Sequence, residues 1–363
     1  MATGEILLFR DPHRYVAHPH MAQLADGSWL VVATCGPRRP VTLHPPIDPE
    51  FVNILLRSTD EGATWSAPVP APGYGATGAE CAGLTVLPDG TVLLNQWRFR
   101  WYPDDAAPAD EPLLQRAPAL SAYLGASTEL DGAAPTGLIN WARGGGDTTV
   151  HRSEDGGRRW VAANLDTAPY TGGYGLRGGL VLPSGAVLLP LSDVPHYARV
   201  FVCRSEDGGR SWSTPIPAAS LPRHEFEEPA PALLPDGSVV LLLRENVSRL
   251  LHIVRSDDEG RTWSAPEPTS IDAYPAHLLV LSDGRLAAVT ARRRPSGAIL
   301  IFLSDDCGHS WDLDRPVVVA EGIATSDLGY PTAVPMRDGR LFVAYYRRDS
   351  AGVTGLWGRA AAA

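Results

Sequence analysis

Apolar residues in this chain fall in short runs rich in valine, leucine and alanine, and one small turn interrupts them repeatedly. The turn reads Leu-x-Asp/Ser-Gly, with Met336 replacing leucine in the last copy, and it occurs six times. Residues 232–243 (Ala-Leu-Leu-Pro-Asp-Gly-Ser-Val-Val-Leu-Leu-Leu) show the arrangement. An Asp-Gly pair between two β-rich runs is typical of a β-hairpin. The pattern therefore predicts six hairpins, with turn glycines Gly27, Gly90, Gly185, Gly237, Gly284 and Gly339.

A second repeat, Ser-x-Asp-x-Gly-x-x-Trp, occurs five times, at 58–65, 153–160, 205–212, 256–263 and 304–311. An aspartate at this place folds a turn through side-chain to backbone hydrogen bonds. Glycine adopts a positive φ at low cost, and tryptophan packs over the hairpin. We predict that these boxes are structural turns that carry no chemistry.

The spacing of the two repeats predicts the fold. In three successive units the box glycine follows the hairpin glycine by 24, 23 and 24 residues (185 to 209, 237 to 260, 284 to 308). Each unit then holds two hairpins, or four strands, and six units around an axis make a propeller. We therefore expect an all-β, six-bladed β-propeller of four-stranded antiparallel blades, closed by the N-terminal strand 5–9. The domain covers 1–363, with a loop insertion at about 101–147.

Charge, cysteine spacing and the N-terminal residues limit the expected binding partners and cellular location. The net charge of −10 comes without a basic stripe, so nucleic acid is not an expected partner. No apolar run reaches the length of a membrane span, and the first residues lack the pattern of a secretory leader. The cysteines show no CxxC spacing, which favours reduced thiols, a cytoplasmic location and no disulfide framework: Cys35, Cys81, Cys203 and Cys307.

Polar residues lie where each inner strand is expected to reach the central channel. Positions nine residues before and seven residues after each hairpin glycine should occupy equivalent places in the blades. Ionisable side chains at the ends of apolar strands cost desolvation unless they have partners or a ligand. A ligand pocket is the favoured interpretation, and ion pairs that brace the channel mouth are the alternative. These positions and their neighbours supply His18, Glu80, Trp97, Arg98, Arg177, Glu228, Arg244, His277, Arg292, Arg293, Arg294, Tyr330 and Tyr346.

Five boxes of this type make nearly the whole chain resemble the sialidase (neuraminidase) superfamily. The resemblance implies an exo-acting glycosidase with a tyrosine nucleophile, a glutamate that activates it and an aspartate as acid/base. Gly329-Tyr330-Pro331 resembles the nucleophile segment, and Glu228-Pro229 with Arg244 resembles the glutamate and one arginine of the carboxylate-binding triad. Arg293 or Arg294 lies near the place of another triad arginine, and Asp48 lies in the acid/base segment.

The chain departs from the family where the first triad arginine is expected, because Ala17-His18-Pro19 replaces Arg-Ile-Pro. Imidazole does not reproduce the bidentate grip of guanidinium on a carboxylate. We therefore expect an acidic or unusual sugar rather than ordinary sialic acid. Trp97, Trp101 and Tyr102 are candidate sugar platforms.

Histidines add a second chemistry. His18 and His20 share one strand face and, with His277 and Glu80, hold ligand types for a metal. Hydrogen bonding to sugar hydroxyls is the favoured interpretation, and we predict no metal and no cofactor. His44 lies in the loop expected over the site.

Three functions stay open from the sequence. The first is a sialidase-like hydrolase with Tyr330, Glu228 and Asp48 as nucleophile, activator and acid/base. The second is a lyase on uronate oligosaccharides that uses His18 or His20 with Tyr330. The third is a glycan-binding propeller without catalysis. In each, the partner is a small saccharide or oligosaccharide.

Overall fold

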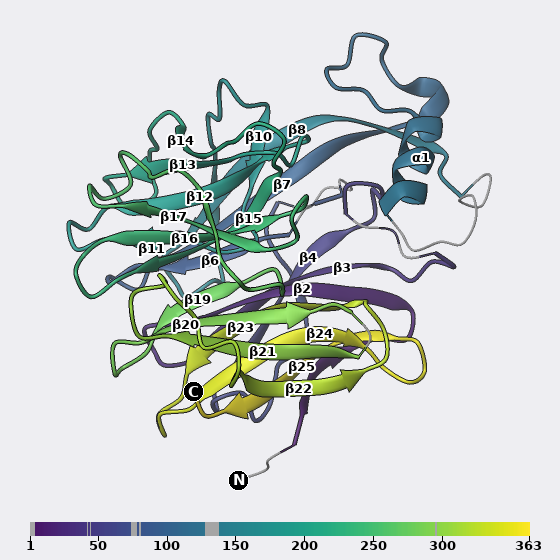
Figure 1. Ribbon diagram of the computed structural model, residues 1–363. Coiled ribbons are helices and arrows are strands. Elements are labelled where there is room, and N and C mark those ends of the chain that lie inside the picture. The colour runs from purple at the N-terminus through teal and green to yellow at the C-terminus, as the bar shows by residue number, and fades with distance from the viewer. Residues whose placement is uncertain are drawn as a thin grey trace.

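The chain folds into six antiparallel sheets arranged around a central axis, as the computed structural model in Figure 1 shows. The structure describes residues 4–41, 43, 45–73, 78–79, 81–127, 138–294 and 296–363. The predicted six-bladed β-propeller is confirmed. The predicted closure is also confirmed: β1 (Ile6–Arg10) pairs with β25 (Thr354–Ala361), so both ends of the chain build the last blade. Joining the first and last strands leaves no free edge where the ring closes.

The blades follow one another along the chain, and the first strand of each lies nearest the axis. The strands of blades 1, 2 and 3 are β2 (Arg14–Gln23), β3 (Trp29–Pro37), β4 (Val52–Ser58) and β5 (Val69–Pro70); β6 (Gly83–Val86), β7 (Val92–Pro103), β8 (Trp141–Ser153) and β9 (Val161–Asn164); and β10 (Gly172–Tyr174), β11 (Leu180–Val181), β12 (Val187–Val194), β13 (Val200–Ser205) and β14 (Ile216–Ala219).

The strands of blades 4, 5 and 6 are β15 (Phe226–Leu233), β16 (Val239–Glu245), β17 (Leu251–Ser256) and β18 (Glu267–Pro268); β19 (His277–Val280), β20 (Leu286–Arg292), β21 (Gly297–Ser304) and β22 (Val317–Ile323); and β23 (Leu328–Pro335), β24 (Leu341–Arg348), β25 and β1.

The Ser-x-Asp-x-Gly-x-x-Trp boxes are turns between the third and fourth strands of their blades. In the first box the Ser58 hydroxyl accepts the Gly62 N–H at 2.8 Å, and Asp60 accepts the Thr64 N–H at 2.9 Å. The Trp65 indole donates to the Gly62 carbonyl at 3.1 Å. The same serine and aspartate bonds recur in the other four boxes. These bonds agree with the prediction of structural turns.

Blade 3 departs from the predicted four strands, because its inner strand is split into β10 and β11, which both pair with β12. Residues 175–179 between them approach the neighbouring blade closely. A side chain at Gly178 would collide with the Leu84 carbonyl, and one at Gly83 would collide with the Arg177 carbonyl. Backbone contact this close requires glycine. The break brings Arg177 to the propeller axis.

The predicted insertion extends strands β7 and β8 beyond the ring and adds two short helices, η1 (Asp104–Ala106) and α1 (Ala117–Ser127) (Figure 1). Strand β8 supports the loop before β4. The Trp141 indole donates to the Ile47 carbonyl at 2.6 Å, and the Arg143 guanidinium donates to the Pro46 carbonyl. The insertion therefore holds the segment that leads to Asp48.

Apolar side chains between neighbouring blades form the core, in which Trp29, Trp97 and Phe201 are fully buried. None of the four cysteines forms a disulfide. Among the residues that the structure describes, no helix is long and apolar enough to cross a lipid bilayer.

Candidate active site

Three inner strands carry the same local distortion at the same height. His18, Glu228 and Tyr330 each precede a proline and have φ of 54°, 53° and 51°. At each place the strand pairing shifts, so that two residues face one on the partner strand, which is a β-bulge. Positive φ is uncommon outside glycine and collects at functional sites. The three bulges turn these side chains from blades 1, 4 and 6 toward a common place.

Tyr330 and Glu228 form the centre of this group. The Tyr330 hydroxyl donates to Glu228 Oε1 at 2.6 Å. The other carboxylate oxygen, Oε2, accepts from Arg244 Nη1 at 3.1 Å. Tyr330 and Glu228 are both buried. A phenol, a carboxylate and a guanidinium are thus linked in one hydrogen-bonded chain.

Glu227 adds a second carboxylate that the sequence analysis did not single out. Its Oε1 lies 3.4 Å from Arg244 Nε and accepts from Asn246 Nδ2 at 2.8 Å. The Tyr174 hydroxyl lies 3.4 Å from both Glu227 and Glu228. Burial raises the pKa of Glu227, although Arg244 opposes the shift. The sequence signal that could have revealed Glu227 is the pair Glu227-Glu228 directly before a proline. Neighbouring residues of a regular strand point to opposite faces, so both carboxylates can face Arg244 only because the strand is bulged here.

His18 and Arg293 flank the other side of Tyr330. The His18 ring lies edge-on to Tyr330, with 4.3 Å between ring centroids, and 5.4 Å from the Tyr346 ring. The guanidinium of Arg293 lies 5.9 Å from the centroid of the Tyr330 ring. Arg293 has no ion pair with a described carboxylate, and its Nε donates to the Ser326 carbonyl. Its positive charge is thus available to an acidic group beside Tyr330.

Only the middle of the three consecutive arginines faces this site. The guanidinium of Arg294 pairs with Asp272, and Arg292 Nε lies 4.0 Å from the same carboxylate. Half or more of the Arg294 side chain is exposed. Arg293 alone is directed inward, whereas the structure places Arg294 at the surface.

Asp48 lies on the loop before β4, where Arg39 grips it with two nitrogens, one of them at 2.9 Å. The carboxylate also accepts the Glu50 N–H at 3.0 Å, and it is fully buried. No hydrogen bond joins Asp48 to Tyr330 or Glu228 among the described residues. Its predicted acid/base role stays a prediction, and the pair with Arg39 must open before Asp48 can give a proton.

Arg177, His20 and His277 lie along the axis but are bonded elsewhere. Arg177 donates to the carbonyls of Ala276 at 2.9 Å, Pro331 at 2.8 Å and Pro19 at 3.5 Å. His20 Nδ1 accepts the Leu84 N–H, and His277 Nδ1 accepts the Ala333 N–H. All three line a cavity of about 340 Å³ in the central channel. No hydrogen bond links them to the Tyr330 side chain in the described part of the chain. They bond instead to backbone groups of neighbouring blades.

Trp97 and Arg98 make their contacts away from the group around Tyr330. Trp97 is fully buried and packs against Phe99, which removes it as a sugar platform because no face of its ring is open. Arg98 donates to the Gly73 carbonyl. Glu80 and His44 lie outside the described residues.

The central group places a buried phenol in contact with a carboxylate that can accept its proton. Burial and the Glu228 carboxylate raise the pKa of Tyr330 well above its ordinary value of 10.0, so the phenol keeps its proton at rest. Glu228, at 2.6 Å, can accept that proton as the oxygen forms a new bond. Arg244 and Arg293 supply positive charge on either side.

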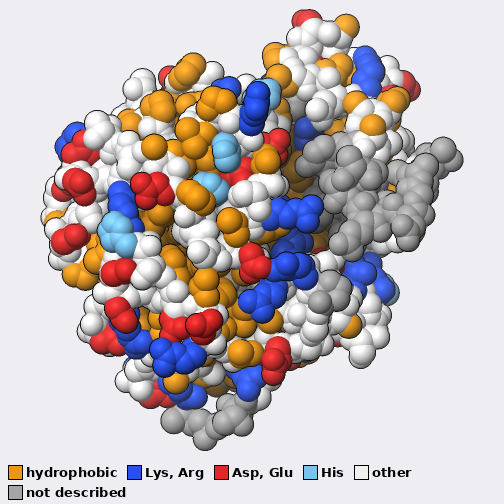
Figure 2. Space-filling model, in the orientation of Figure 1, with side chains coloured by type: hydrophobic (Ala, Val, Ile, Leu, Met, Phe, Trp, Pro, Cys, Tyr) orange, Lys and Arg blue, Asp and Glu red, His pale blue; other side chains and the backbone are white. Residues whose placement is uncertain are grey.

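Basic side chains gather on one face of the molecule. Figure 2 shows several of them in the middle of the visible face, over the region where β3 and β4 lie in Figure 1. Arg38 and Arg39 follow β3 and, with Arg348, line a small cavity of about 100 Å³. Arg39 pairs with Asp48 and Glu50, and Arg348 pairs with Asp327, so nearby carboxylates balance much of this positive charge.

Comparison with known proteins agrees with the architecture. Residues 136–343 match the family model of the BNR repeat-like domain. A sialidase of Micromonospora viridifaciens is 26% identical over 232 residues, which cover 53% of this chain and 33% of that protein. The chain thus spans about a third of the length of that relative.

Two solved structures share the fold. A protein of unknown function from Dyadobacter fermentans has a TM-score of 0.81 at 22% identity, covering 99% of this chain and 97% of its own. The NanB sialidase of Streptococcus pneumoniae has a TM-score of 0.70 at 13% identity, covering 98% of this chain and 70% of its own.

Proposed function

The chain belongs to the BNR repeat-like family of sialidase-superfamily propellers, and on that premise we propose that it is an exo-acting glycoside hydrolase for an acidic or unusual sugar. The observation that carries the proposal is the 2.6 Å hydrogen bond from Tyr330 to Glu228. A neutral phenol is a weak nucleophile, and a carboxylate in contact with its proton is the activation it needs.

In the proposed first step the Tyr330 oxygen bonds to the anomeric carbon of the sugar while its proton passes to Glu228. The bond from that carbon to the leaving oxygen breaks, and Asp48 donates a proton to the leaving oxygen. In the second step water attacks the same carbon, and Asp48 takes a proton from the water. The bond from that carbon to the Tyr330 oxygen breaks, and Tyr330 recovers its proton from Glu228.

Arg244 and Arg293 suit the acidic group of the substrate, because Arg244 contacts Glu228 and Arg293 lies beside the Tyr330 ring. His18 occupies the place where the family resemblance expects an arginine, and its ring is buried against Tyr330. Two guanidinium groups and one imidazole bind a planar carboxylate less firmly than three guanidinium groups. This difference supports a substrate other than ordinary sialic acid.

One contact favours a second candidate, elimination from a uronate. His18 and Tyr330 have ring centroids only 4.3 Å apart, as a base and acid acting on one sugar require. His18 would remove the proton beside a carboxylate held by arginine, and Tyr330 would protonate the leaving oxygen. The product would carry a conjugated double bond that absorbs ultraviolet light.

A screen of aryl glycosides of sialic acid, its deaminated analogue and uronic acids, followed by Tyr330→Phe on any active substrate, tests the proposal. We expect Tyr330→Phe to lower turnover by on the order of 10³-fold or more while the circular dichroism spectrum is unchanged. Tyr170→Phe is the matched control, since Tyr170 stacks on Phe201 in blade 3. Equal turnover in the two variants would remove Tyr330 from the reaction. Binding without any product would favour a glycan-binding propeller.

A further inference from the structure

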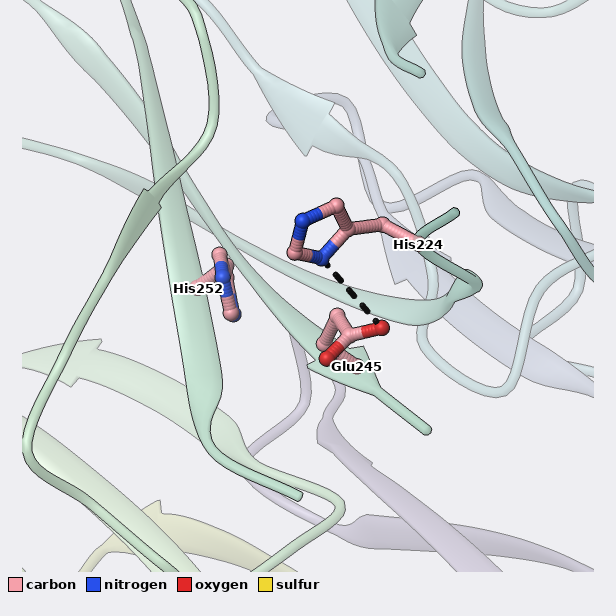
Figure 3. A group of neighbouring side chains, drawn as sticks. All are labelled: His224, Glu245 and His252. Atoms are coloured by element: carbon pink, nitrogen blue, oxygen red, sulfur yellow. Dashed lines mark ion pairs between the residues drawn. The ribbon is translucent and has the colours of Figure 1, made fainter. Parts of the chain in front are cut away.

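A group of three potential metal ligands lies on blade 4, apart from the Tyr330 site. His224 precedes β15, Glu245 ends β16 and His252 lies near the start of β17. One ligand atom from each lies within 4.8 Å of the other two. Figure 3 shows the three side chains turned toward a common point from three neighbouring segments.

Glu245 is a buried carboxylate that several hydrogen bonds hold in place. Its Oε1 accepts the N–H groups of Glu225 and Val247, each at 3.0 Å, and its Oε2 accepts the N–H of Ser248 at 2.5 Å. The Ser248 side chain also donates a hydrogen bond to this carboxylate. These bonds fix the carboxylate beside the two histidines.

His252 presents a lone pair because of its own backbone contact. Its Nδ1 lies 3.3 Å from the Leu250 carbonyl. A carbonyl only accepts, so Nδ1 carries the hydrogen and Nε2 carries the lone pair. Metal-binding histidines are commonly oriented in this way by a carbonyl.

His224 has a buried nitrogen that lacks a hydrogen bond. Its Nδ1 lies 3.6 Å from Glu245 Oε1, and it has no hydrogen-bond partner among the described residues. A buried polar atom without a partner is costly, and it points to a missing partner. The rest of the ring is half-exposed beside Phe226 and His252.

We propose that His224, Glu245 and His252 form a zinc site, with water in the remaining coordination position. Two imidazoles and one carboxylate are a donor set that suits Zn²⁺ and not calcium or magnesium, which prefer all-oxygen sites. Bonds of about 2.0–2.2 Å place tetrahedral ligand atoms about 3.4 Å apart. Metal uptake therefore draws the three side chains together, and the half-exposed loop residue His224 is the one free to move.

The site would connect two segments that carry the Tyr330 machinery. Glu245 directly follows Arg244, and His224 lies in the loop that leads into β15, shortly before Glu227 and Glu228. A metal across these segments would tie the ends of β15 and β16 together. Its function would be to stabilise blade 4 next to the substrate, with no metal in the reaction itself.

The test is a zinc titration of the full-length chain without a histidine tag, after removal of metal with EDTA, in competition with a chromophoric chelator. We expect one Zn²⁺ per chain. His224→Asn, on an exposed loop, and His252→Asn should each weaken zinc affinity by on the order of tenfold or more. His309→Asn is the control, because His309 is exposed and outside the group.

Circular dichroism on each variant verifies that it has folded before the affinities are compared. Absence of zinc uptake would overturn the proposal and leave only the contact between His224 Nδ1 and Glu245 Oε1 in its place. The same affinity in His224→Asn and His309→Asn would overturn it too, as would uptake of calcium but not zinc.

Discussion

The hydroxyl of Tyr330 lies 2.6 Å from Oε1 of Glu228, although 102 residues separate the two along the chain. The contact depends on matching β-bulges in blades 4 and 6, where each residue has a positive φ before a proline. His18 occupies the equivalent bulge in blade 1. One backbone device, used three times, thus assembles the proposed nucleophile, its activator and a flanking imidazole.

Replacement of His18 distinguishes the two enzymatic candidates. Asparagine is a suitable substitute, because it tolerates the positive φ of this position better than most residues. If the protein is a hydrolase, His18→Asn should raise KM and change kcat less than about tenfold, since His18 only contacts the substrate. If it is a lyase, kcat should fall by about 10²- to 10⁴-fold, as expected for loss of a general base.

The measurement is kcat and KM on the active substrate, with products identified by mass spectrometry. His13→Asn is the control, since His13 is exposed. Unchanged kcat and KM in His18→Asn would contradict both candidates.

Asp48→Asn should slow the release of poor leaving groups far more than that of good ones. An acid that protonates the leaving oxygen raises the rate by about 10²- to 10⁴-fold. A phenol of low pKa leaves as the phenolate and does not need to be protonated. Rates are measured on aryl glycosides whose phenols span a wide range of pKa. The comparison variant is Asp105→Asn, at an exposed position on η1. A uniform loss across all phenols would show that Asp48 supports the loop through Arg39 and is not the acid.

Arg177→Met should lower the free energy of unfolding by about 3 kcal/mol or more, because buried carbonyls would lose their donor. The guanidinium spans the axis and donates to carbonyls of blades 1, 5 and 6. Urea unfolding measures the change, with Arg210→Met at the exposed surface as the control. Equal stability of the two variants would mean that Arg177 does not hold the blades together.

The free energy of unfolding should fall at acidic pH because Glu245 becomes protonated. Burial raises the pKa of this carboxyl, but hydrogen bonds from Ser248, Glu225 and Val247 outweigh it and hold the pKa at about 2. Because the folded-state pKa lies below the unfolded value of 4.5, the stabilisation is present above pH 4.5 and is lost as the pH falls toward 2.

Glu245→Gln should therefore reduce the free energy of unfolding at pH 7 by about 1.5–3 kcal/mol, the range for hydrogen bonds to charged groups. The difference from the unmodified chain should shrink between pH 4.5 and pH 3. Urea unfolding in EDTA removes any contribution from metal, and Glu267→Gln on exposed β18 is the control. A difference that is constant over this pH range would contradict the assignment.

The propeller could be predicted because its signals are local. Asp60 and Gly62 form their turn through bonds that span a few residues, and the same pattern recurs in the other boxes. Equal spacing between repeats then leaves few architectures possible. The repeat also placed Tyr330 and Glu228 at equivalent positions that face the same axis, and the family resemblance implied their pairing.

Side-chain contacts between different blades could not be predicted from these local repeats. The sequence did not distinguish Arg293 from its neighbours, because orientation depends on where β20 ends and on the carboxylate of Asp272. It counted Arg177 as a ligand for substrate, whereas the split inner strand of blade 3 directs it to backbone carbonyls of other blades.

Glu227 shows the same limit within one strand, because alternation alone would point it away from Glu228, and only the bulge brings both to Arg244. The sequence by itself determined the repeating turns, the number of blades and the set of chemical groups near the axis. Tertiary packing decided which of those groups meet, since a side chain's partners depend on segments that are distant in the chain.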